Sequence, residues 1–279
     1  MPIVYACIAP HGSEAIPQLA SRIARRKFRP TTVGMEKMAR EVKLAKPDII
    51  VIASPHNLRL WRHIGIVIAE YSSGTLRASP HSRKSVTLKM KCDVGFARAL
   101  MALASKRRLP VVGVNYGSAE GRASDMPMDW GVLIPLWFFA RKLRRRPSIV
   151  IVTPSREIAL HRNFEFGKAI ADLAERSRKR IVFVASADQA HAHKKSGPYG
   201  FSRRAREYDR MVLDLVSRNR LQSIVRIDRR LVEEAKPDSL WQIVMLAGVA
   251  EKVKLRGSIL SYQAPTYFGM TCASFQRIG

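Results

Sequence analysis

The 279-residue sequence has few cysteines, no long apolar run and a shortage of acidic residues. Its three cysteines, Cys7, Cys92 and Cys272, show no paired spacing, which argues against a disulfide framework and favours a reducing compartment. No apolar run approaches the ~18 residues of a membrane span, and the first residues do not form a basic stretch followed by a long apolar one. We therefore expect a cytoplasmic protein without a membrane segment.

The shortage of acidic residues gives the chain a strong positive charge. Asp and Glu number 22 against 49 Lys and Arg, so the net charge is +27. Such a charge attracts nucleic acid, anionic surfaces or acidic substrates. The densest basic runs are 141–146 and 203–206, and none is interleaved with the aromatic residues that stack on bases. We interpret most of these runs as solvated basic faces, and charge alone then accounts for incidental nucleic-acid binding.

The chain shows no linker, low-complexity tract or internal repeat, which predicts a single domain over residues 1–279. Apolar runs typical of buried strands alternate with helix patterns along its length. The predicted architecture is therefore one α/β domain, with an αβα arrangement around a mixed, mostly parallel central sheet. Within it, we predict a turn at Ser73-Gly74 and an antiparallel pairing of residues 85–90 with residues 63–71.

Two short phrases carry most of the functional signal: Ala9-Pro10-His11-Gly12 and Ser54-Pro55-His56-Asn57. Each follows a continuous apolar run, as expected of a strand covered on both faces. Ligands of parallel sheets bind beyond the carboxyl ends of the strands, so His11 and His56 can lie side by side there as a metal-binding pair. A third histidine, His191, follows another predicted strand at 181–186. His193 lies two residues on and could take its place.

Longer phrases make the chain resemble the class III extradiol ring-cleavage dioxygenase family, which includes the catalytic subunit of protocatechuate 4,5-dioxygenase. The resemblance runs nearly end to end. It is carried by the order and spacing of Pro10-His11-Gly12, Ser54-Pro55-His56, the stretch 128–136, Ala187-Asp188-Gln189-Ala190-His191, Gly197-Pro198-Tyr199-Gly200 and Ser261-Tyr262-Gln263-Ala264-Pro265.

The resemblance implies a non-haem Fe(II) enzyme that cleaves a catechol-type aromatic with O₂. In that family two histidines and a glutamate hold iron, and this ligand set leaves positions open for the substrate and O₂. His11 and His56 match the histidine ligands, and His191 matches the acid/base histidine. Trp130, Tyr199 and His193 are expected at the substrate pocket.

Two positions depart from the family pattern. Trp130 stands where the family has an active-site histidine, and Gln263 stands where its last ligand would be a glutamate. Gln263 can still coordinate through its carbonyl oxygen, and we take it as the third ligand. Other residues that could supply the missing anionic ligand are Asp129, Asp188, Glu207 and Asp209, with the Cys272 thiolate as a further alternative.

These departures leave two classes of function open. The first is an Fe(II)-dependent extradiol dioxygenase that acts on a small aromatic substrate with O₂. The second is an altered or inactive paralogue that binds a partner through its basic surface and holds another divalent metal or none. Members of the family often assemble with themselves or with a small partner subunit, and the sequence leaves homo-oligomerisation open.

Overall fold

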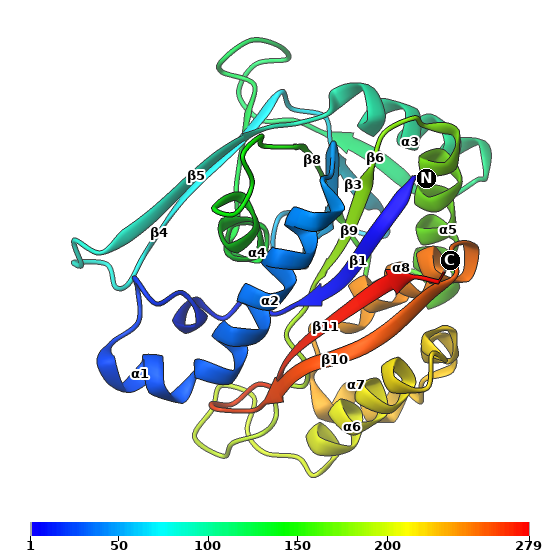
Figure 1. The fold of residues 1–279 in the computed structure, drawn as a ribbon. Helices are drawn as coiled ribbons and strands as arrows, with labels where there is room; N and C mark the ends of the chain where they lie inside the picture. Colours follow the sequence, from blue (N-terminus) through cyan, green and yellow to red (C-terminus); the bar gives the residue numbers. More distant parts are fainter. Residues whose placement is uncertain (1, 279) are drawn as a thin grey trace.

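The centre of the fold is an eight-stranded sheet with the strand order β10-β11-β1-β9-β2-β8-β3-β6 (Figure 1). The structure is a computed structural model and describes residues 2–278. The strands of this sheet are β1 (Ile3–Ala9), β2 (Ile49–Ala53), β3 (Ile64–Val67), β6 (Val111–Val114), β8 (Ser148–Thr153), β9 (Ile181–Ser186), β10 (Leu255–Gln263) and β11 (Met270–Arg277).

The four inner strands β1, β9, β2 and β8 run parallel, so their carboxyl ends share one edge. Their apolar runs are buried on both faces, which explains why they lack the alternation of a half-exposed strand. Antiparallel pairs join β11 to β1 and to β10, and β3 to β8. The prediction of a mixed, mostly parallel sheet in an α/β fold is confirmed.

Helices cover both faces of this sheet, as Figure 1 shows. One face packs on α3 (Val94–Lys106), α5 (Leu160–Arg176), α6 (Arg204–Ser217), α7 (Arg229–Ala235) and α8 (Leu240–Lys252), and the other on α2 (Arg29–Ala45) and α4 (Trp130–Ala140). A short α1 (Arg22–Lys27) precedes α2, and 3-10 turns occupy Ser13–Ala15 and Leu221–Arg226. The alternation of strands and helices therefore produces two separate apolar cores.

The most apolar helix, α4, is a core element. Asp129 caps its first turn by accepting a hydrogen bond from the Val132 amide, and every residue from Gly131 to Ala140 is buried. It has only 11 residues. Within residues 2–278, no helix combines the length and apolarity that crossing a bilayer requires.

A second, three-stranded sheet corrects the predicted turn at Ser73-Gly74. Both residues lie inside β4 (Tyr71–Arg77), which pairs with β5 (Ser85–Lys91) and β7 (Asp125–Pro127). The partner of β5 is therefore β4, and the predicted pairing of residues 85–90 with 63–71 is wrong, because residues 85–90 pair with 72–77. Gly74 serves close packing, because a Cβ there would lie 2.5 Å from the Met128 carbonyl oxygen.

Candidate metal centre

The parallel strands bring His11 and His56 together. His11 follows β1 and His56 follows β2, and both strands flank β9, so the two loops leave the same edge of the sheet. The two Nε2 atoms lie 3.1 Å apart, and the rings meet edge to face with centroids 4.9 Å apart. His11 is buried and His56 is partly buried. The strand-end phrases thus predicted a real juxtaposition.

The third member of the cluster is Asp238, which sequence reasoning missed. Asp238 lies just before α8, and its Oδ2 is 3.3 Å from His11 Nε2 and 3.1 Å from His56 Nε2. It is buried, and within residues 2–278 neither of its carboxylate oxygens makes a hydrogen bond of good geometry. In the sequence, Pro237-Asp238-Ser239 resembles an ordinary helix start, so nothing marked this carboxylate as functional. Together the three side chains could hold a metal ion.

Ser186, the last residue of β9, fixes the His11 ring. Its hydroxyl donates to the Gly131 carbonyl oxygen and therefore accepts from His11 Nδ1, 3.0 Å away. With its proton on Nδ1, a neutral His11 keeps the lone pair of Nε2 directed at His56 and Asp238. A hydrogen bond on the far ring nitrogen is the usual way in which proteins orient a ligating histidine.

Two buried carboxylates make the pair a favourable place for positive charge. Asp188 accepts from the His11 amide and lies 3.4 Å from His11 Nε2. Burial lowers the pKa of His11, but Asp188 and Asp238 outweigh it and raise that pKa to about 9. Burial raises the pKa of Asp188 to about 7, whereas His11 and His56 outweigh burial at Asp238 and hold its pKa well below the usual range. Asp238 is therefore the anionic partner of the pair.

His191 lies beside the pair with one nitrogen free. Its Nδ1 donates to the Gln189 carbonyl oxygen at 2.9 Å, which leaves Nε2 as an acceptor. Burial lowers the pKa of His191, so the ring is neutral near neutral pH. Such a ring can accept a proton from a bound molecule.

Two cavities meet at His56, His191 and Tyr199. The first, of about 360 Å³, is also lined by Asp238 and is basic, with Arg59, Arg156 and Lys236 in its wall. The second, of about 490 Å³, is also lined by His11 and is aromatic, with walls from Trp130, Tyr267 and Phe268. The candidate metal centre thus opens onto a space that suits a flat ring.

Trp130 forms the side of the aromatic cavity next to His56. It is the first residue of α4, its ring is stacked on His56 with centroids 4.3 Å apart, and 48% of its surface is exposed. On the other side of the cavity, His191 stacks on Phe268 and meets Tyr199 edge to face. Trp130 thus forms part of the cavity wall beside His56.

The structure does not bring Gln263 or His193 to this centre. The Gln263 amide donates to the Thr31 hydroxyl at 2.6 Å, and its side chain lines neither cavity at the pair. His193 Nε2 bonds Asp209 Oδ2 at 2.7 Å and lines a different cavity. Gln263 was expected there because its phrase aligns with that of the family's last ligand, and His193 because it lies two residues after His191. In the structure, the segments that carry these two residues place their side chains away from the histidine pair.

The remaining alternatives for the anionic ligand are engaged elsewhere. Asp129 caps α4 and accepts from the Ser54 hydroxyl. Glu207 pairs with Arg204, and Asp209 bonds His193. Burial raises the pKa of the Cys272 thiol to about 12, so this sulfur stays protonated. Only Asp188 among these alternatives lies next to the histidine pair.

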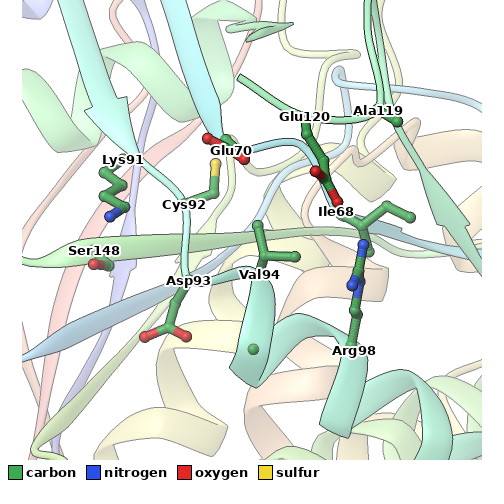
Figure 2. Close-up of a pocket in the computed structure, with 11 residues that line it drawn as sticks. Ile68, Glu70, Lys91, Cys92, Asp93, Val94, Arg98, Ala119, Glu120 and Ser148 are labelled. Atoms are coloured by element: carbon green, nitrogen blue, oxygen red, sulfur yellow. The ribbon is translucent and has the colours of Figure 1, made fainter. Parts of the chain in front are cut away.

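A further cavity lies at the opposite edge of the sheet and lacks such chemistry. It has a volume of about 440 Å³ and borders Ser148, the first residue of β8 (Figure 2). Its one thiol belongs to Cys92, and burial raises the pKa of that thiol to about 12. The Cys92 thiol is therefore protonated at neutral pH, which disfavours a role as a nucleophile.

Comparisons with known proteins found a curated relative and a solved structure of similar fold. Among curated proteins, CA_C1420 from Clostridium acetobutylicum is 25% identical over 258 residues, which cover 92% of this chain and 54% of that protein. The chain thus spans about half the length of this relative. The crystal structure of the uncharacterized protein JW3007 from Escherichia coli K12 shares the fold, with a TM-score of 0.60 at 17% identity, and the match covers 97% of this chain and 99% of that one.

A match to a family model assigns the chain to a protein family. The model described as the catalytic LigB subunit of aromatic ring-opening dioxygenase matches residues 5–272, which include all the residues of the candidate centre. This match spans nearly the whole length of the sequence. The chain therefore belongs to the family of the catalytic LigB subunit of aromatic ring-opening dioxygenases.

Proposed function

We propose that the protein is an Fe(II)-dependent extradiol dioxygenase that opens the ring of a catechol-type substrate with O₂. The observation that carries this proposal is the convergence of His11, His56 and Asp238 at one edge of the sheet. Two histidines and one carboxylate form the ligand set of non-haem Fe(II) oxygenases. In this proposal Asp238 takes the ligand role that the sequence pattern gave to Gln263.

The donor atoms fit a metal ion. Two nitrogen ligands at ~2.1 Å from a metal, with a right angle between them, lie ~3 Å apart, and the two Nε2 atoms here are separated by 3.1 Å. Among the described residues 2–278, no other group donates a hydrogen bond to the buried Asp238 carboxylate, as expected of a carboxylate that binds a cation. When bound, Fe(II) supplies the positions at which a catechol and O₂ are activated together.

The side chains around the centre provide binding and proton transfer. The walls of Trp130, Tyr199 and Phe268 hold an aromatic ring against the centre. His191 accepts a proton at Nε2 from a substrate hydroxyl, because its Nδ1 is committed to the Gln189 carbonyl. The same ring then returns the proton later in the reaction. No histidine is needed at position 130 for this transfer.

The alternative, an inactive paralogue that binds through its basic surface, has less support. Its motives were the departures at positions 130 and 263 together with the net charge of +27, and Asp238 offers an anionic ligand in place of residue 263. Part of the basic run at 141–146 is also engaged within the protein, since Arg141 and Lys142 pair with Glu36.

Iron analysis and oxygen consumption test the proposal together. Protein purified without oxygen should contain about one iron per chain and should consume O₂ with at least one member of a catechol panel. His191→Ala should keep the iron and lose turnover by at least ~100-fold. His161→Ala, a change on the exposed side of α5, serves as the matched control and should behave as wild type. A wild-type protein that contains no iron and consumes no O₂ with any member of the panel would overturn the proposal.

A further inference from the structure

A separate cavity of about 510 Å³ lies beyond the loop that follows β10. Its walls come from the loop after β9, from α6 and from the end of β10, and they include Lys194, Arg206, Arg210 and Tyr262. Thr266 lines both this cavity and the aromatic cavity of the candidate metal centre. Neither His11 nor His56 lines it, so its ligand would not be held by the metal centre.

A buried hydrogen-bond network makes the wall of this cavity rigid. Asp209 is fully buried, and its Oδ1 accepts from the Ala190 amide at 2.9 Å. Its Oδ2 accepts from His193 Nε2 and from the Tyr262 hydroxyl, both at 2.7 Å. The network joins three segments that are distant in sequence. Its hydrogen bonds occupy both carboxylate oxygens of Asp209 inside the protein. Asp209 is therefore not a counterion for the cations at the cavity.

Those cations have no partner of their own. Within residues 2–278, Lys194, Arg206 and Arg210 form no ion pair or side-chain hydrogen bond, although each lines the cavity. Other arginines at the ends of the same helix are paired: Arg204 with Glu207, and Arg218 with Asp214. The arginines near the two ends of α6 thus form ion pairs, whereas the two arginines at the cavity form none with the described residues.

The unpaired arginines also work against the stability of the helix. Arg206 and Arg210 are four residues apart, so their like charges lie on one face of α6 and repel each other. His193 also lines the cavity, and its Nδ1 has no hydrogen bond inside the described chain. Tyr262 and Pro265 supply an apolar wall next to these polar groups. Such a cluster gains stability when a compact anion joins it.

We propose that this cavity binds a phosphate dianion, either free phosphate or the phosphate group of a small phosphomonoester. Two guanidinium forks and one ammonium match a doubly charged group with several acceptor oxygens. The ring of Tyr262 offers a surface for the organic part of a phosphomonoester. This site is independent of the proposed dioxygenase activity and of any metal at the histidine pair.

Calorimetric titration with phenyl phosphate and phenyl sulfate tests the proposal. The two probes share a shape, but the phosphate carries close to two negative charges and the sulfate carries one. At ~0.15 M ionic strength and with EDTA present, phenyl phosphate should bind saturably with one site per chain, and phenyl sulfate at least ~10-fold more weakly. Inorganic phosphate as a third probe identifies the source: equal affinity indicates free phosphate, and weaker affinity indicates a phosphomonoester.

Matched charge variants separate this cavity from the general basicity of the chain. Arg206→Ala with Arg210→Ala should lower the affinity for phenyl phosphate at least ~10-fold. Arg144→Ala with Arg145→Ala removes the same charge elsewhere and should change the affinity less than twofold. The single variants Arg206→Gln and Arg210→Gln replace the double variant if it fails to fold. The proposal is overturned if the wild type shows no saturable binding, or if the two double variants lose affinity equally.

Discussion

Asp238→Asn is the sharpest perturbation of the candidate metal centre. Asparagine keeps the size and shape of the side chain and removes only the negative charge that lies 3.1 Å from His56 Nε2 and 3.3 Å from His11 Nε2. The Gln263→Ala variant is the natural comparison, because Gln263 bonds Thr31 and lines neither cavity at the pair. The two variants therefore separate the ligand proposed from the structure from the one suggested by the sequence.

The pKa shift of His11 sets the size of the expected loss in metal affinity. The two carboxylates raise the pKa of His11 from 6.5 to about 9 despite its burial, which amounts to about 3 kcal/mol in favour of a positive charge there. A divalent cation bound at the same place is stabilised by the same two negative charges. Since Asp238→Asn removes one of the two charges and a ligand oxygen, we expect metal affinity to fall on the order of 100-fold.

Anaerobic competition titration against a chromophoric chelator measures this change directly. Wild type and Gln263→Ala should bind Fe(II) with the same affinity, and Asp238→Asn should bind far more weakly while it retains the circular dichroism spectrum of the wild type. Equal affinities for Asp238→Asn and wild type would refute the assignment of Asp238. A loss in Gln263→Ala as large as that in Asp238→Asn would refute it as well.

Three further predictions concern orientation, packing and pH. Ser186→Ala leaves His11 Nδ1 without its acceptor and should weaken metal binding 10–100-fold in the same titration, and unchanged affinity would contradict the orienting role. Gly74→Ala places a Cβ 2.5 Å from the Met128 carbonyl oxygen and should lower the free energy of unfolding in urea by ~1–3 kcal/mol. Gly95→Ala is the control, because the nearest atom to its Cβ would lie at 3.7 Å, and it should not lower the free energy of unfolding. Equal losses in the two variants would exclude the packing argument. In metal-free protein the folded state holds extra protons on Asp188 up to pH about 7 and on His11 up to about 9, so the free energy of unfolding should fall as pH rises from 5 to 9. His11→Gln should flatten the upper part of that curve, and an unchanged curve would show that His11 is not its source.

The sequence by itself determined the parallel strands and the pairing of His11 with His56. Buried parallel strands must be apolar throughout, and their carboxyl ends must meet at one edge, so His11 and His56 could be paired without coordinates. His191 could be added on the same ground, because it follows β9, the strand between β1 and β2. By contrast, Ser73-Gly74 was misread as a turn, since a glycine required for close packing and a glycine required for a turn give the same local signal.

Only the tertiary structure showed which carboxylate lies beside the histidine pair and which side chains line the pocket. Asp238 precedes a helix, and its distance from the pair depends on how α8 packs beneath the sheet, where the Gln242 side chain bonds the Ser186 carbonyl oxygen. Gln263 matches the family phrase but turns its amide to Thr31, and His193 is held by the buried Asp209. Local pattern specifies strands and their ends because an apolar run and the residues that end it are adjacent in the sequence. Which side chains from distant segments meet is set by core packing, which no short phrase encodes.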